Sequence, residues 1–118
     1  MSNSTRPPGK TTVSPEVLVS IAKLSALGVP GVSHMAAVPG GVNRLFRRGF
    51  GEGVRIEIEE NTVYAEMYLV LKEDVNIREV SRNVQYQVAR AIQEMVGMDV
   101  GYVNIHIEDI NYRENNEA

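Results

Sequence analysis

The sequence contains no cysteine and only two histidines among its 118 residues. Without cysteine there is no disulfide framework, no thiolate nucleophile and no cysteine-based zinc site. A reducing cytoplasm fits this composition, and we expect a cytoplasmic protein. His34 and His106 provide little for an acid–base or metal site, because zinc needs at least three ligands and no cluster has that spacing. We therefore expect no catalytic residues, no metal, no cofactor and no enzymatic activity.

Long apolar runs are also missing. No segment approaches the ~18 apolar residues of a membrane span, and the first residues lack an apolar run of signal-peptide length. Any membrane association is therefore expected through a partner or a surface contact. The net charge of −3 and the pI of about 5.4 argue against nucleic-acid binding by the chain as a whole, which needs a basic face. A local basic patch remains compatible with these values.

The length and the order of the patterns predict a single domain at residues 13–110. Residues 1–12 are polar and contain Pro7-Pro8-Gly9, which is typical of a disordered tail, and residues 111–118 form an acidic tail. Ser14-Pro15 predicts a helix start, with Ser14 as the N-cap and proline in the first turn. On this helix Val17, Ile21 and Leu24, flanked by Leu18, are expected to face inward. Gly28 and Pro30 end it.

Alternating residues predict the strands. A short strand is expected at Val32–Val38, and strict alternation predicts two more, from Val54 to Glu59 and from Val63 to Val70, joined by a tight turn at Glu60-Asn61. A further strand is expected at residues 102–110, with Val103, Ile105 and Ile107 facing the core. His106 is expected on its outer side, near Glu57 and Glu108.

A second helix is predicted to begin at Asn76, with Glu79 completing a capping box, and to end at Gly97. Its expected inward stripe consists of Ile77, Val80, Val84, Val88, Ala91, Ile92 and Met95. The order α-β-β-β-α-β predicts an α+β fold in which two helices pack on one face of a small, largely antiparallel four-stranded sheet. The other face of the sheet is then left bare.

Several short motifs occur along the chain in a characteristic order and spacing: Ile21-Ala22, Pro30-Gly31-Val32, Gly53-Val54, Val84-Gln85, Val88, Ala91-Ile92, Gly97, Val103-Asn104-Ile105 and Ile107. In this order and spacing the sequence closely resembles the alkaline shock protein family of Gram-positive bacteria. The resemblance implies a non-enzymatic assembly or adaptor protein of the general or envelope stress response. It also implies a homo-oligomer, in some cases held beneath the membrane by a small membrane-anchored protein partner.

The bare sheet face is the expected self-association surface. It would carry Tyr64, Tyr68, Val70 and Tyr102, together with Arg55, Glu57, Glu66 and His106. Uncovered aromatic and apolar side chains of this kind are a plausible contact surface. We expect replacement of Tyr64 and Tyr68 by serine to lower the association state.

Residues 39–52 read as a long loop, rich in glycine and arginine. Its arginines and phenylalanines form a candidate partner-binding element. Those residues are Arg44, Phe46, Arg47, Arg48 and Phe50. The bound group could be an acidic protein, an anionic lipid or an RNA backbone, and a solvated loop is the alternative.

Two other functions stay open. Gly28-Val29-Pro30-Gly31 has the GxxG form of KH domains, so a KH-like nucleic-acid-binding module is one alternative, although a strand is expected after it where a KH domain has a helix. A small regulator of a metabolic enzyme is the other. The glycine-rich segments lack the lysine-serine/threonine ending of a nucleotide-binding loop, which argues against nucleotide binding.

Overall fold

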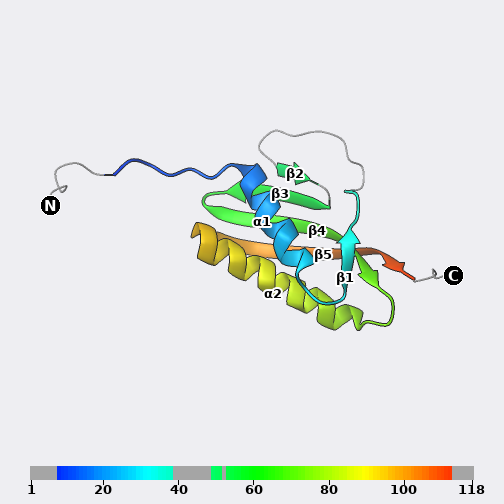
Figure 1. Ribbon diagram of the computed structural model, residues 1–118. Helices are drawn as coiled ribbons and strands as arrows, with labels where there is room; N and C mark the ends of the chain where they lie inside the picture. Colours follow the sequence, from blue (N-terminus) through cyan, green and yellow to red (C-terminus); the bar gives the residue numbers. More distant parts are fainter. Residues whose placement is uncertain (1–7, 39–48, 52, 113–118) are drawn as a thin grey trace.

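Two helices cover one face of a mixed sheet in the computed structural model, which describes residues 8–38, 49–51 and 53–112 (Figure 1). The helices are α1 (Pro15–Leu27) and α2 (Ile77–Val96). The strands are β1 (Val32–Met35), β2 (Gly49–Gly51), β3 (Val54–Glu59), β4 (Thr62–Lys72) and β5 (Asp99–Asn111). The α+β architecture predicted from the sequence is confirmed. The four expected strands are present in the expected order as β1, β3, β4 and β5.

The long strand β4 lies at the centre of the sheet. One of its edges pairs with β5 in parallel, from Thr62 to Lys72. The other edge pairs antiparallel with β3 over residues 62–67 and with β1 over residues 69–71. Strands β1 and β3 therefore lie end to end along the same edge of β4. Three of the four pairings are antiparallel, as expected for a largely antiparallel sheet.

Tyr68 marks the point where β1 and β3 meet. Its N–H donates to the carbonyl of Gly53 and its carbonyl accepts from the N–H of Ala36, both at 2.8 Å. Gly53 has φ +75°, and a Cβ there would lie 2.7 Å from the Ala36 carbonyl oxygen. Only glycine fits this junction without strain, because the backbone is left-handed and two neighbouring chain segments approach it closely.

The hairpin between β3 and β4 follows the sequence. Glu60 and Asn61 have φ of 48° and 66°, so both central turn residues are left-handed, as the twist of a tight hairpin requires. Residues 49–51 differ from the expectation. They were predicted to belong to the loop at residues 39–52, but they form β2, which pairs with β3 and extends the sheet by a fifth, short strand. Three residues are too few to show an alternating pattern.

The core lies between the helices and the sheet. β4 contributes a fully buried row consisting of Val63, Ala65, Met67, Leu69 and Leu71. From α2 the buried residues are Val80, Val84, Val88 and Ile92, the central part of the predicted stripe. Ile77 and Met95, in the first and last turns of α2, were expected inward but are 47% and 70% exposed. The side-chain oxygen of Asn76 accepts from the N–H of Glu79, and Gly97 is left-handed, so Asn76 and Gly97 cap α2 as predicted.

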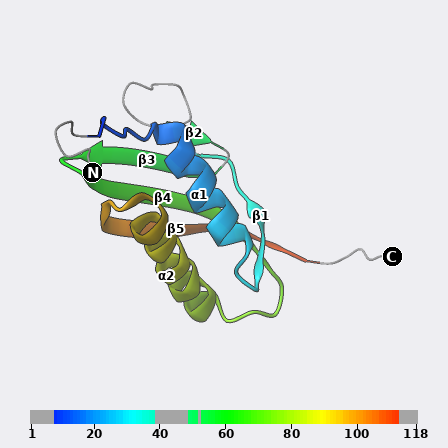
Figure 2. The same cartoon turned by 60° about the vertical axis from the view of Figure 1, so that its left-hand side comes forward.

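The orientation predicted for α1 is right in part. Of the residues expected to face inward, Leu18 is buried and Ile21 packs against the core, but Val17 and Leu24 are 46% and 69% exposed. The other buried residues of α1 are Val19, Ala22 and Ala26. The helix is apolar around most of its circumference, so periodicity alone does not select its inner face. The observed inner face carries two alanines, which let α1 approach the sheet closely. The view in Figure 2 shows α1 and α2 on the same side of the sheet.

Candidate functional site

The candidate site is the sheet face opposite the helices. Cross-strand register brings its residues together: Arg55 of β3 lies opposite Glu66 of β4, and Glu57 lies opposite Tyr64. On the other edge of β4, Tyr64 lies opposite Tyr102 and Tyr68 opposite His106. Residues of β4 with even numbers therefore form a row along this face, with partners on both sides.

Two β-bulges in β5 keep its apolar residues on the core side of the sheet along the whole strand. The register shifts by one residue between Val63 and Tyr64, where β5 has the extra residue Gly101, and again between Leu69 and Val70, where it has Glu108. Each extra residue reverses the alternation of inner and outer faces. Val100, Ile105, Ile107 and Ile110 consequently all pack against the core. Without the shifts, Val100 and Ile110 would point to the opposite face from Ile105 and Ile107.

Gly101 also makes room for Tyr64. A Cβ at residue 101 would overlap the Tyr64 ring, so the ring lies directly over the glycine backbone. The Tyr64 and Tyr102 rings then face each other, with centroids 5.0 Å apart and planes tilted by 58°. This is a favourable geometry for an aromatic pair.

Glu66 is the hub of a polar network on this face. Its Oε1 lies 2.6 Å from Nε2 of His106, and its Oε2 accepts a hydrogen bond from Nδ2 of Asn104 at 3.1 Å. The sequence-based analysis placed His106 near Glu57 and Glu108 and did not identify Glu66 as its partner. The parallel pairing of β4 with β5 decides this contact, and the parallel pairing is not visible in the alternation of either strand.

Tyr68 connects the polar network around Glu66 to strand β3. Its ring stacks on the His106 ring, with centroids 4.6 Å apart and an interplanar angle of 12°, and its hydroxyl accepts a hydrogen bond from Nη2 of Arg55 at 3.2 Å. Tyr68 and the neighbouring Val70 are only 6% and 8% exposed. Of the four residues predicted to mediate self-association, Tyr64 and Tyr102 are thus the ones that a partner could reach.

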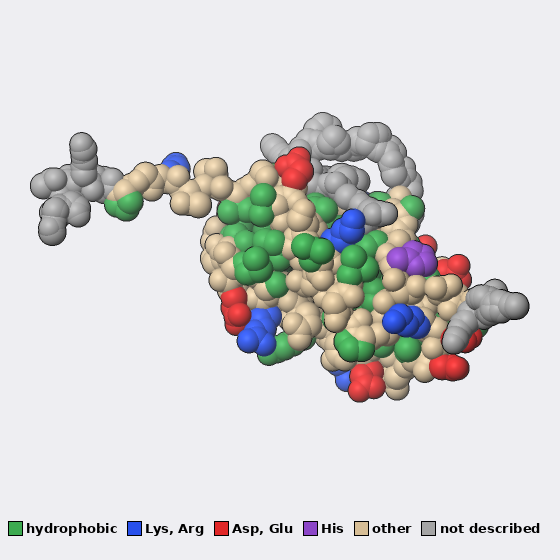
Figure 3. Space-filling model, in the orientation of Figure 1, with side chains coloured by type: hydrophobic (Ala, Val, Ile, Leu, Met, Phe, Trp, Pro, Cys, Tyr) green, Lys and Arg blue, Asp and Glu red, His purple; other side chains and the backbone are tan. Residues whose placement is uncertain are grey.

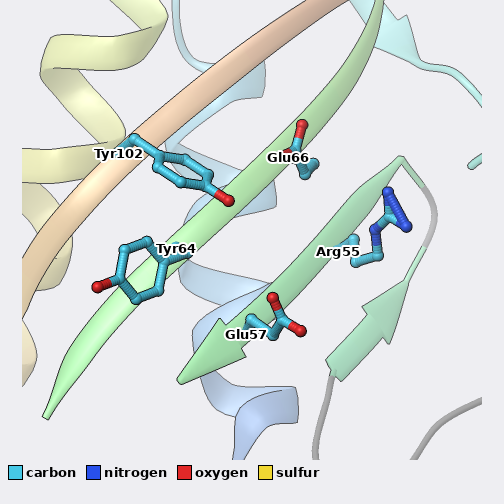
Figure 4. Close-up of a pocket in the computed structure, with 5 residues that line it drawn as sticks. All are labelled: Arg55, Glu57, Tyr64, Glu66 and Tyr102. Atoms are coloured by element: carbon cyan, nitrogen blue, oxygen red, sulfur yellow. The ribbon is translucent and has the colours of Figure 1, made fainter. Parts of the chain in front are cut away.

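A hollow of about 170 Å³ opens between these side chains (Figure 4). It is lined by Arg55, Glu57, Tyr64, Glu66 and Tyr102. Partial burial raises the pKa of Tyr102, and the negative charges of Glu66 and Glu57 raise it further, while Arg55 opposes them. The hollow therefore offers carboxylates and the Tyr102 hydroxyl, beside the Tyr64 ring, in an electronegative setting that suits hydrogen bonding to a partner's polar groups.

The described part of the chain contains no group of three His, Asp or Glu residues placed to hold a metal ion. His34, the other histidine, lies on β1, where its Nδ1 is 3.0 Å from the Ser33 hydroxyl. Over the same residues, no helix is both long and apolar enough to cross a membrane.

The predicted partner-binding element falls largely outside the described residues. This holds for Arg44, Phe46, Arg47 and Arg48. The backbone of Phe50 lies in β2, opposite Arg55. Gly28–Gly31, the GxxG segment, connects α1 to a strand, as the sequence indicated. Gly31 has φ +103°, and a Cβ there would lie 2.7 Å from Val80, so packing against α2 accounts for this glycine.

Sequence reasoning missed the outer surface of α1, because it placed the residues that form it in the core. The signal was nonetheless present. Between Pro15 and Leu27 the only charged residues are Glu16 and Lys23, too few to cover a solvent-facing side of a helix.

The fold defines a class of small α+β domain in which two helices cover one sheet face and leave the other to aromatic and charged side chains. The chain belongs to the alkaline shock protein family, whose described function is cell envelope-related and whose family model matches residues 3–112. The resemblance read from the sequence motifs is thereby confirmed.

Individual relatives agree with this assignment. The chain is similar to uncharacterized protein YqhY of Bacillus subtilis (strain 168), with 29% identity covering 88% of this chain and 78% of the relative. It is also similar to YloU of the same organism, with 27% identity covering 86% and 88%. A third relative is Spy1535 of Streptococcus pyogenes serotype M6, with 32% identity covering 86% and 79%. No solved structure matches the chain significantly.

Proposed function

We propose that this protein is a non-catalytic assembly and adaptor protein with a cell envelope-related or general stress role. It acts in the cytoplasm as a homo-oligomer and reaches the membrane through a membrane-anchored protein partner. The family assignment supports the envelope connection. In this proposal the protein acts by self-association.

The observation that carries the proposal is the sheet face opposite the helices. Tyr102 is 43% exposed, and Tyr64 beside it is half-buried. Both rings are held in fixed positions by Gly101 and by each other. Tyrosines fixed in this way contribute contact area at little entropic cost, and tyrosine is enriched at protein interfaces.

The test is the association state of the Tyr102→Ser variant, measured by sedimentation velocity over a range of concentrations. Tyr102→Ser should weaken association with helix content unchanged, because the side chain is outside the core. Tyr112→Ser is the matched control, since Tyr112 is 66% exposed and directly follows β5. Equal association of Tyr102→Ser and wild type would refute the role of this face.

Tyr68→Ser should behave differently from the expectation drawn from the sequence alone. Because Tyr68 is nearly buried, stacked on His106 and bonded to Arg55, its loss should destabilise the fold as well as alter the surface. It is therefore unsuitable as a test of association.

Recruitment to a partner is proposed to use Arg44, Arg47 and Arg48, with Phe46 and Phe50. Guanidinium groups bind carboxylates and phosphates through paired hydrogen bonds, so three of them close together suit an acidic surface. Changing the three arginines to glutamate should abolish membrane recruitment of a fluorescently tagged chain in cells. The matched control reverses three exposed cations elsewhere, Lys72, Arg78 and Arg82. Recruitment that survives the first change but not the second would overturn this assignment.

The non-catalytic part of the proposal is tested at the histidines. His34→Ala and His106→Ala should both give folded chains that still associate. A metal bound through either residue, or a turnover lost on either substitution, would contradict it. Strongly salt-dependent RNA binding by the purified chain would instead support the KH-like alternative.

A further inference from the structure

Strand β5 forms the longest open edge of the sheet. It runs from Asp99 to Asn111 and pairs with β4 on one side, and within the described residues no other strand pairs with its outer side. Figures 1 and 2 both show β5 at the margin of the sheet, beside α2. An edge of this length presents a row of backbone N–H and C=O groups that another chain segment can bind.

A hydrogen bond from α2 shows which backbone groups of β5 point outward. Nε2 of Gln85 donates to the carbonyl oxygen of Val103 at 3.0 Å. Because Gln85 is exposed, this carbonyl is reached from the solvent side and does not point toward β4. In a regular strand the backbone groups of every second residue point to the same edge, so those of Ile105 and Ile107 also point outward.

The outward stretch of β5 lacks the features that usually protect an edge strand. Natural edges are blunted by charged side chains, proline or bulges. The two bulges of β5, at Gly101 and Glu108, enclose a regular stretch at residues 102–107, which contains neither proline nor any Asp, Glu, Lys or Arg. The neighbouring helix differs, since charged side chains of both signs lie along the lower side of the molecule in Figure 3, where α2 runs.

We propose that the outer edge of β5 binds an extended segment of a partner protein, which adds to the sheet as a further strand along residues 102–107. The side-chain amide of Gln85 already supplies an N–H to Val103, and an amide N–H is the donor that a partner's backbone offers. Binding exchanges this internal donor for a backbone donor of the partner. Gln85 therefore competes with the partner for the edge.

The side chains along β5 define the chemistry of the partner segment. On the helix side, Ile105 and Ile107 pack against the core and keep part of their surface exposed, so the partner's residues beside them should be apolar. On the other side, the partner's residues lie beside Asn104 and His106 and should be polar. Glu108 follows the stretch, so a basic residue at the N-terminal end of an antiparallel segment meets an opposite charge.

A partner segment fits this edge better than a second copy of β5. Two copies paired edge to edge would have to displace Gln85 twice, once in each copy, whereas a partner segment displaces it once. The inference also goes beyond the proposed function, because it uses backbone groups of β5 and not the tyrosine or arginine side chains. A monomeric chain that binds a partner segment would contradict self-association and support this edge, and the reverse result would do the opposite.

A synthetic peptide tests the edge directly. The probe alternates threonine and valine after an N-terminal lysine, and every second backbone nitrogen is methylated, so that the peptide has one free edge and cannot stack with itself. The matched control has the same sequence with every backbone nitrogen methylated, so it has no N–H to donate. Fluorescence anisotropy of the labelled peptides should show saturable binding of the probe to the full chain and at least about tenfold weaker binding of the control.

A substitution at Gln85 tests the competition. Gln85→Ala should strengthen binding of the probe about two- to tenfold, because the probe no longer displaces an internal hydrogen bond. Gln87→Ala is the matched control, since Gln87 is also on α2 but lines the hollow beside α1, and it should leave binding unchanged. Unchanged or weaker binding by Gln85→Ala would overturn the assignment of the site to this edge.

Amide hydrogen exchange, measured by NMR on the isotope-labelled chain, locates the bound peptide. At saturating probe the amides of Ile105 and Ile107 should exchange at least about tenfold more slowly, while those of Asn104 and His106, which point toward β4, should change little. Binding without slower exchange at Ile105 and Ile107 would overturn the proposal.

Three further results would also overturn it. The first is the absence of saturable binding up to about 1 mM probe, and the second is equal binding of the two peptides. The third is protection of the Ile105 and Ile107 amides that appears without the probe and increases with the concentration of the chain, because a second copy would then occupy the edge.

Discussion

At the residue scale, single glycines decide where side chains and strands can go. Gly53 allows β1 and β3 to meet against Tyr68, Gly101 leaves space for the Tyr64 ring, and Gly31 lets the chain pass Val80. At each position a methyl group would meet an atom that has little freedom to move. These glycines are therefore explained by close approach, which is a stronger constraint than backbone conformation alone.

The Gly53→Ala substitution should lower the free energy of unfolding by about 2 to 5 kcal/mol. The left-handed backbone contributes about 1 to 2 kcal/mol, and overlap with Ala36 and Met35 contributes the rest. Gly97→Ala is the control, because Gly97 is also left-handed, with φ +80°, but has no atom within 4 Å of the added methyl group. It should lose only about 1 to 2 kcal/mol. Urea titration measures both, and equal losses would show that crowding at Gly53 is unimportant.

The raised pKa of Tyr102 predicts a loss of stability at alkaline pH. Burial and the carboxylates of Glu66 and Glu57 favour the neutral phenol in the folded state. Its folded pKa is above the unfolded value of about 10, so the folded chain binds the proton more tightly. The resulting stabilisation is fully present below pH ~10 and disappears as the pH rises through the folded pKa.

Denaturant titrations at several pH values above neutrality test this effect. Tyr102→Phe should make the alkaline decline less steep, and Tyr112→Phe, which removes an exposed phenol outside the site, should leave the decline as in wild type. An identical decline in wild type and Tyr102→Phe would contradict the assignment of the effect to Tyr102.

At the element scale, the two helices differ in what holds them in place. α2 has a satisfied N-cap, a left-handed C-cap and a narrow apolar stripe, so its bounds and its orientation can both be predicted from sequence. α1 begins where Ser14-Pro15 indicates, but its orientation cannot be predicted, because apolar residues surround it. Which face is buried depends on the fit of Ala22 and Ala26 to the sheet.

The caps themselves give a prediction. Asn76→Ala should cost about 1 kcal/mol of stability, because it removes the acceptor of the Glu79 N–H. Ser14→Ala should cost clearly less, since the Ser14 side chain makes no capping hydrogen bond on α1. Thermal unfolding of the two variants side by side provides the comparison. A larger loss for Ser14→Ala would mean that the Ser14 hydroxyl caps α1 in solution.

Among the strands too, the alternation of apolar and polar residues predicts some pairings and does not predict others. The hairpin of β3 and β4 is predictable, because alternation and Glu60-Asn61 are local signals. The parallel pairing of β5 is not, since it joins residues far apart in the chain, as in the contact of His106 with Glu66. The sequence consequently indicated which residues share the bare face, but not which of them touch.

At the scale of the whole molecule, β4 organises the sheet. It is hydrogen-bonded along one edge to β5 and along the other to β3 and β1, while β2 adds only three residues beside β3. The helices pack over one side of this sheet and leave the other to the tyrosine cluster. The molecule therefore presents two different surfaces, the helices on one side and the open sheet face with the tyrosine cluster on the other.

Amide hydrogen exchange should reflect the central position of β4 and the peripheral position of β2 in the sheet. Backbone amides of β4 between Val63 and Leu71 should exchange most slowly, because they are paired on both sides beneath fully buried side chains. Amides of β2 should exchange fastest among the strands. Mass spectrometry or NMR can measure both, and slower exchange in β2 than in β4 would contradict the described topology.

The junction at Tyr68 has a consequence for how this domain can be varied. Gly53 and Ala36 are hydrogen-bonded to the N–H and the carbonyl of this one residue, so the two ends of the segment between them are held close together. The entropy of closing such an excursion grows only slowly with its length. A peptide inserted between Ala36 and β2 should therefore cost little stability, while β1, β2, β3 and the core keep their places.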